Sequence, residues 1–92
     1  MNLYYVGMKM VKSEIFSQAI KERTKVRFYY ELQEVILDPY FILVEEDGTK
    51  AIYGKSFSNP KLDKFDFERI VNIRLLPLEH FIPIVPVSPL YN

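Results

Sequence analysis

The segment Tyr40–Phe57, with the sequence YFILVEEDGTKAIYGKSF, decides the fold of this chain. Two runs rich in β-branched and aromatic residues flank the turn residues Glu-Glu-Asp-Gly-Thr. Within that turn, Asp47-Gly48 supplies the left-handed backbone that a tight reversal requires. The segment therefore predicts a β-hairpin. Because an isolated hairpin is marginal in water, we expect further strands or a helix to cover one of its faces.

The residues that precede the hairpin predict one helix and two strands. Ser13–Glu22 reads as a short helix in which Ser13 caps the first turn. Its apolar side chains form one stripe, made of Ile15, Phe16, Ala19 and Ile20. Lys25–Glu31 then alternates with period two, so it predicts a strand with Val26, Phe28 and Tyr30 on one face. A second strand, Glu34–Leu37, is expected to end at a bend at Asp38-Pro39.

The residues that follow the bend predict the remaining strands. After the bend we expect a strand at Tyr40–Glu46, which returns as Lys50–Phe57, and then a short strand containing Phe65, Phe67 and Arg69-Ile70. The last regular strand is expected at Val71–Leu76, with Val71, Ile73 and Leu75 alternating against Asn72, Arg74 and Leu76. One helix before five or six short strands predicts a mainly β domain. Its expected form is a small, bent antiparallel barrel with the helix across one opening; the alternative is a flat two-layer α+β sheet.

Composition and length indicate a single globular domain. The chain has 92 residues, 49% of them hydrophobic and 26% charged, which is ordinary for a globular protein. It has no cysteine, which excludes disulfides, thiolate metal sites and cysteine nucleophiles. The N-terminus lacks the order of a secretory signal, and no apolar run approaches the ~18 residues of a membrane span. We expect a soluble cytoplasmic protein with no membrane partner.

Three regions are expected along the chain. Residues 1–12 are apolar enough to form an N-terminal arm or an extra strand, residues 13–78 form the barrel, and residues 79–92 form a proline-rich extended tail. Prolines recur at every third position of the tail, at Pro83, Pro86 and Pro89, which is typical of a polyproline-like segment. The apolar residues of the tail either fold back on their own barrel or cover a neighbouring subunit. The second arrangement would make a homo-oligomer.

Residues typical of catalysis or metal binding are nearly absent. His80 is the only histidine and has no cysteine or second histidine to share a metal with. The acidic run Glu45–Asp47 lacks the alternating spacing of a calcium loop. We therefore expect no enzyme activity, no metal and no cofactor.

Charge is distributed unevenly, although the net charge is zero. Six basic and two acidic residues lie between Lys9 and Arg27, and six acidic residues with no basic one lie between Phe28 and Thr49. The chain from Lys50 to Arg74 is again basic. Such a division favours either an anionic ligand or two solvated faces that have no partner.

Basic residues alternate with aromatic residues on or beside the predicted strands. Small barrels bind single-stranded nucleic acid by stacking bases on aromatic side chains while cations hold the phosphates. The candidate residues for binding nucleic acid or a small anionic ligand are Arg27, Tyr29, Lys50, Tyr53, Lys55, Arg69 and Arg74. Alternation places Tyr53 and Lys55 on one face of their strand and Lys50 on the other. The alternative role for these tyrosines is half-buried packing.

Three segments between about Ile15 and Phe81 resemble the WYL domain family, which occurs mostly in bacterial transcription regulators and phage-defence proteins. They are AIKERTKVRFYY (residues 19–30), DPYFILVEEDGTKAIYGKS (residues 38–56) and FDFERIVNIRLL (residues 65–76). The positions that match the family pattern are Tyr30, Tyr40, Gly54, Phe65, Arg69 and Ile70. The chain departs from that pattern at the naming triad, which is replaced by Lys50-Ala51-Ile52, and at a family arginine, which is replaced by Asp66.

The resemblance implies a small Sm/SH3-like barrel. It also implies a non-enzymatic regulatory module that senses an anionic ligand or binds nucleic acid. Because the triad and the arginine are lost, the alternative is a protein-interaction or self-assembly module in which the ligand site has degenerated.

Overall fold

The computed structural model describes residues 11–84 as one helix followed by five strands, with a short 3-10 helix between the last two strands. The elements are α1 (Lys12–Glu22), β1 (Thr24–Tyr30), β2 (Gln33–Val44), β3 (Lys50–Ser56), β4 (Asp63–Asp66), the 3-10 helix η2 (Phe67–Arg69) and β5 (Ile70–His80). The predicted class, mainly β with one N-terminal helix, is confirmed, and the strands number five within these residues.

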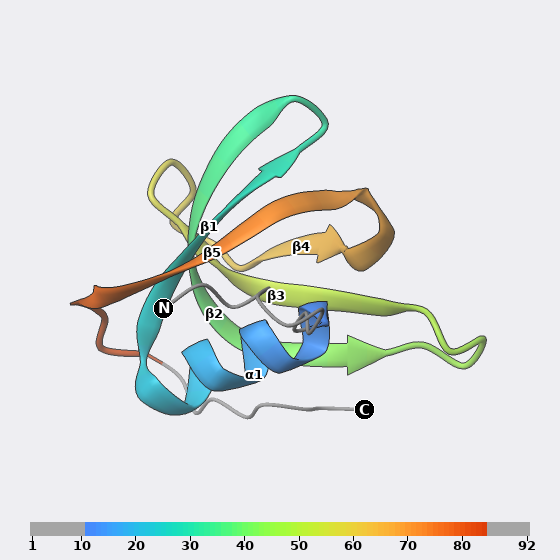
Figure 1. The fold of residues 1–92 in the computed structure, drawn as a ribbon, viewed down its shortest axis with the longest axis horizontal. Helices are drawn as coiled ribbons and strands as arrows, with labels where there is room; N and C mark the ends of the chain where they lie inside the picture. The colour runs from blue at the N-terminus through green and yellow to red at the C-terminus, as the bar shows by residue number, and fades with distance from the viewer. Residues whose placement is uncertain (1–10, 85–92) are drawn as a thin grey trace, which may run out of the picture.

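All five strands form one antiparallel sheet in the order β4-β3-β2-β1-β5. The two edge strands, β4 and β5, are joined only by the three residues Phe67–Arg69. A connection this short requires the sheet to curl until its two edges approach each other, and Figure 1 shows β4 passing into β5 through it. The sheet is therefore a small open barrel with an inner face and an outer face.

The core lies between α1 and the inner face of the sheet. The predicted stripe of α1 is buried, and Phe16 packs edge-on against Phe28 of β1 at 5.9 Å between ring centroids. Phe28 in turn contacts Phe65 of β4, so the aromatic core connects the helix, the middle of the sheet and its edge. Burial of these rings and of the aliphatic residues around them is the main term that stabilises the fold.

The predicted cap of α1 is wrong. The N-cap is Val11, whose backbone N–H donates to Glu14 Oε1 at 3.0 Å, and the helix begins at Lys12. Ser13 lies inside the first turn, where its hydroxyl accepts a hydrogen bond from Lys50 Nζ. The first backbone N–H groups of a helix have no partner within the helix. Here the Glu14 carboxylate accepts the N–H of Val11, as the third helical residue does in a capping box.

The strand end predicted at Asp38-Pro39 is wrong, because β2 runs through both residues. Pro39 pairs with Gly54 of β3, and the register shifts between Pro39 and Phe41, so one extra residue, Tyr40, is accommodated there. A bulge of this kind twists the sheet and admits a residue that cannot donate to the ladder. Two predicted strands are consequently one strand of 12 residues.

The strand boundaries after residue 60 also differ from the prediction. Phe67 and Arg69 belong to η2, and the strand before them is Asp63–Asp66. The prediction that Val71 shares a face with Ile73 is wrong, because Ile73 is buried whereas Val71 is 54% exposed. Asn72 adopts a positive φ of 56°, and the pairing of β1 with β5 shifts register at this point, so the alternation restarts with Ile73 inward. Alternation cannot anticipate such a bulge.

Strand β5 continues through Pro77 to His80, beyond the end expected from sequence. Phe81 then turns onto the barrel, where its N–H donates to Arg23 O at 2.9 Å and its ring stacks on Tyr40 at 5.9 Å. The predicted arm at residues 1–12 and tail at residues 79–92 fall mostly outside the described residues.

Candidate functional site

The seven residues predicted as a binding site fall at three separate places. Arg27, Tyr29, Tyr53, Lys55 and Arg74 lie on the outer face of the sheet, on strands β1, β3 and β5. Lys50 lies at the start of β3, next to the N-terminal turn of α1. Arg69 lies on η2, at the corner between the two edge strands.

The outer face brings two arginines directly opposite each other. Arg27 of β1 and Arg74 of β5 are Cα partners in the ladder. Directly opposite residues hold their Cβ atoms about 5 Å apart, and like charges there destabilise a sheet. Arg27 is partly compensated by Glu34 of β2, at 3.4 Å from Nε to Oε2. Within residues 11–84, the exposed Arg74 makes no ion pair.

Tyr29 lies beside this pair of arginines. It is two residues beyond Arg27 on the same face of β1 and is 38% exposed. Its Cα partners are Glu34 on one side and Val71 on the other. An exposed phenol ring next to two guanidinium groups provides a surface on which a planar group can stack.

A second group of charges extends the outer face toward β3. Lys25 Nζ binds Asp38 Oδ1 at 2.7 Å, and Lys55 is the Cα partner of Asp38 on the other side. Since Asp38 is already paired with Lys25, Lys55 has no ion pair among the described residues. On the described strands β1, β2, β3 and β5, the outer face thus carries four cations (Lys25, Arg27, Lys55, Arg74) and two carboxylates (Glu34, Asp38), a local charge of 4 − 2 = +2.

Tyr53 has a packing role on this face. Its ring stacks on Phe41 of β2 at 4.9 Å between centroids, and both rings are half-buried. Tyr53 is therefore less accessible to a ligand than Tyr29. As alternation predicted, Tyr53 and Lys55 share one face of β3 while Lys50 falls on the other.

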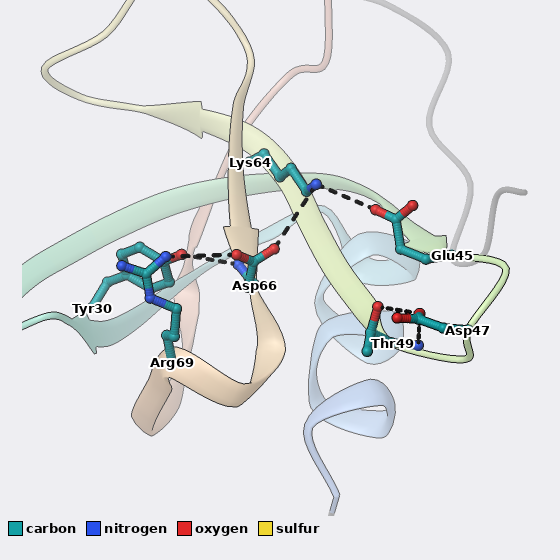
Figure 2. Close-up of polar contacts among 7 residues, drawn as sticks. All are labelled: Tyr30, Glu45, Asp47, Thr49, Lys64, Asp66 and Arg69. Carbon is teal, nitrogen blue, oxygen red and sulfur yellow. Dashed lines mark hydrogen bonds and ion pairs between the residues drawn. The ribbon is translucent and has the colours of Figure 1, made fainter.

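Arg69 is held by carboxylates of its own chain. Its guanidinium pairs with Glu31 of the β1–β2 turn and with Asp66 at 3.7 Å, and it lies over the ring of Tyr30 at 5.1 Å. The Tyr30 hydroxyl accepts the backbone N–H of Asp66 at 3.2 Å. Figure 2 shows the side chains of Tyr30, Asp66 and Arg69 gathered at this corner. Arg69 therefore links the end of β4 to the β1–β2 turn.

Lys50 lines a cleft between the β2–β3 hairpin tip and the β4–η2 corner. The cleft has a volume of about 820 Å³. Its charged lining consists of three lysines (Lys12, Lys50, Lys64) and five carboxylates (Glu45, Glu46, Asp47, Asp66, Glu68). An excess of carboxylates repels an anion. Among the described residues, no three His, Cys, Asp or Glu side chains are placed so that they could hold a metal ion together.

Internal contacts occupy much of this cleft lining. Lys64 Nζ bridges Glu45 at 3.2 Å and Asp66 at 4.0 Å, and the hydrogen bond to Glu45 raises the pKa of Lys64 (Figure 2). Asp47 accepts both the backbone N–H and the hydroxyl of Thr49, and these bonds lower the pKa of Asp47. The lysine links Glu45 of the hairpin to Asp66 of β4, and the aspartate closes the hairpin turn.

Three exposed apolar residues on or beside the outer face were not predicted as surface residues. Phe57 is fully exposed directly after β3, Ile36 of β2 is 40% exposed, and Val71 is exposed because of the bulge at Asn72. An apolar residue is expected to be inside, so its type alone gives no signal of a surface role. For Phe57, the period-two pattern of β3 gave a signal, because it places Phe57 on the same face as Tyr53 and Lys55.

The positions that match the WYL pattern serve mainly as scaffold. Phe65 and Ile70 are core residues, and Tyr40 is buried with its hydroxyl accepting the backbone N–H of Ile84 at 3.2 Å. A Cβ added to Gly54 would lie 2.3 Å from the carbonyl oxygen of Asp38, so the close approach of β2 and β3 requires glycine there. The similarity of sequence thus concerns the architecture more than a binding surface.

No helix among the described residues is both long and apolar enough to cross a membrane. No protein-family model matches the chain, and no curated protein matches it. Among solved structures, the chain is similar to proteasome accessory factor B/C (PafBC) of Arthrobacter aurescens, with a TM-score of 0.61 and 20% sequence identity. The similarity covers 78% of this chain and 13% of that chain. It shows that this barrel shares its fold with one segment of a much longer protein.

Proposed function

We propose that this chain is a WYL-like regulatory domain that binds single-stranded nucleic acid on the outer face of its sheet. The sequence resemblance supports the first part. The fold that the chain shares with one segment of PafBC is compatible with a small barrel of this kind. The second part is carried by one observation, the direct opposition of Arg27 and Arg74.

The opposed arginines favour a bound polyanion for an electrostatic reason. Two guanidinium groups on neighbouring strands repel each other. Among residues 11–84, only Arg27 has a carboxylate partner, and that carboxylate is itself half-exposed. A phosphate between them would replace that repulsion with two charge-assisted hydrogen bonds. The pair therefore stabilises a complex more than it stabilises the free barrel.

The spread of the cations favours a chain of phosphates over one small anion. Lys55, Arg27 and Arg74 lie on three different strands of a sheet whose neighbouring strands are about 4.8 Å apart. They do not converge on one point, and Tyr29 offers a ring for stacking beside them. Cations that follow a backbone together with an aromatic platform are the usual elements of single-strand binding.

Titration of a labelled oligonucleotide across a salt series tests this function. Binding should weaken steeply with salt, because each phosphate contact releases counterions. Arg74→Gln should lower the affinity and reduce the slope of log K against log salt by about 0.7, whereas Lys21→Gln, an exposed lysine of α1, should change neither. Absence of binding at low salt, or binding that is indifferent to salt, would contradict the proposal.

A second candidate function, self-association, is favoured by the exposed apolar residues near the C-terminal end of the described chain. Leu78, Ile82 and Ile84 are largely exposed, whereas Phe81 between them is buried. Truncation before Phe81 would remove a core contact as well as these residues, so substitution is the better test. If Ile82→Ser combined with Ile84→Ser leaves the molar mass from light scattering unchanged, this candidate is excluded.

A further inference from the structure

We propose that Phe57 is a second base-stacking residue, at the far end of a track that crosses the outer face from β5 to the end of β3. The inference rests on the proposed function and specifies the path of the strand. Phe57 directly follows β3, and its relative exposure is 101%, so its ring makes no packing contribution to its own barrel.

Phe57 and two residues of the outer face line the same groove. The groove has a volume of about 360 Å³ and lies at the rim of the barrel: Glu34, Ile36 and Phe57 line its outer side, and the core-facing Val35 and Phe65 line its inner side. Ile36 is the Cα partner of Arg27, and Glu34 is the Cα partner of Tyr29. These two pairings place the outer side of the groove next to Arg27 and Tyr29.

These pairings define one row of side chains across the sheet. Arg74 lies opposite Arg27, Arg27 lies opposite Ile36, and Ile36 shares the groove with Phe57. Three strand-to-strand steps of about 4.8 Å give the row a length of roughly 14 Å. This length exceeds that of a single phosphate group and suits a short run of nucleotides.

The composition of the row favours nucleic acid over a protein partner. Single exposed apolar residues are common on protein surfaces. Here, however, Phe57 continues a row in which cations and apolar side chains share one surface. Aromatic rings accept any base by stacking, and the arginines hold phosphates between the rings. A purely apolar protein contact would provide no counter-charge for Arg74, which makes no ion pair among the described residues.

Tryptophan fluorescence tests the inference directly, because the chain contains no tryptophan. Phe57→Trp would place a single indole at the site. Addition of a ten-nucleotide oligothymidine at low salt should quench its fluorescence through stacking. Leu32→Trp is the matched control, since Leu32 is 98% exposed but lies at the β1–β2 turn and outside the row. Its fluorescence should not respond.

Affinity measurements on Phe57→Ala separate this inference from the proposed function. Loss of one stacked base should weaken binding on the order of tenfold without changing the salt slope, whereas Arg74→Gln should change the slope. If the natural chain binds but Phe57→Ala binds equally well, this inference is overturned and the proposed function stands. No binding by the natural chain would overturn both. A change in oligomeric state alone on Phe57→Ala would assign Phe57 to a protein interface and overturn the inference.

Discussion

At the scale of single residues, Gly54 sets how closely two strands can approach. It pairs with Pro39 at the bulge of β2, and a Cβ there would meet both Asp38 O at 2.3 Å and Leu37 Cγ at 2.9 Å. The first obstacle is backbone, which cannot move without separating the strands. The requirement at Gly54 is therefore spatial and does not arise from its backbone angles.

Gly54→Ala should lower the free energy of unfolding by about 3 kcal/mol, because overpacking must displace the backbone of β2. Gly48→Ala is the matched control. Gly48 has a φ of 89° and no atom within 4 Å of the added Cβ, so alanine there costs only backbone strain, about 1 kcal/mol. Urea denaturation measures both. Equal losses in the two variants would refute a steric role for Gly54.

The identity and strand face of the candidate cations could be predicted from sequence, but their partners on distant segments could not. Alternation correctly separated Lys50 from Lys55. It gave no indication that Arg69 would pair with Glu31, because those residues meet only after the sheet curls. It also could not show that Lys50 would join a cleft with an excess of carboxylates. Which charged groups form ion pairs depends on the tertiary structure.

At the scale of elements, the turn between β1 and β2 has unfavourable residues for its geometry. Glu31 and Leu32 have φ values of 51° and 70°, and they form a two-residue connection between the paired Tyr30 and Gln33. Such connections prefer glycine and asparagine, because other residues are strained at positive φ. Leu32 is also almost fully exposed, so no packing offsets the strain.

Leu32→Gly should therefore stabilise the chain, by about 1 kcal/mol, by removing the strain of a left-handed leucine. Leu78→Gly is the matched control, because Leu78 is 92% exposed in β5 but is not among the residues with positive φ. Glycine there should destabilise the chain by about 0.5–1 kcal/mol through its backbone entropy. Thermal unfolding should shift upward for the first variant and downward for the second. The same sign in both would contradict this interpretation.

Prolines explain why the elements were predicted too short. Pro39 and Pro77 each suggested the end of a strand, yet both lie inside strands. Pro39 sits next to a register shift, and Pro77 sits in an edge strand where another shift separates the pairings of Thr24 and Lys25. Bulges and edges are the two places where a sheet tolerates proline. Sequence alone does not show where a strand lies in the sheet.

At the scale of the whole molecule, the chain closes on itself through Phe81. This residue follows the last strand, stacks on Tyr40 of β2 and binds the carbonyl of Arg23 at the end of α1. It thereby joins the helix, the bulged strand and the end of β5. Of the tail residues for which the sequence offered two alternatives, Ile82 and Ile84 are described, and both are largely exposed on the barrel.

Phe81→Ala should lower the free energy of unfolding by about 3 kcal/mol, because it removes a buried ring. Ile82→Ala should have almost no effect, since Ile82 is 90% exposed. Guanidinium denaturation of the two variants measures the difference. A small effect of Phe81→Ala, comparable to that of Ile82→Ala, would show that the C-terminal segment does not secure the barrel.

The most direct test of the proposed function compares two double variants that lose the same charge from different faces. Arg27→Gln with Arg74→Gln removes two cations from the outer face, and Lys12→Gln with Lys21→Gln removes two from α1. Oligonucleotide titrations across a salt series should show a lower affinity and a slope reduced by about 1.4 for the outer-face variant alone. Equal weakening in both variants, or unchanged binding in the outer-face variant, would contradict a nucleic-acid surface on the sheet.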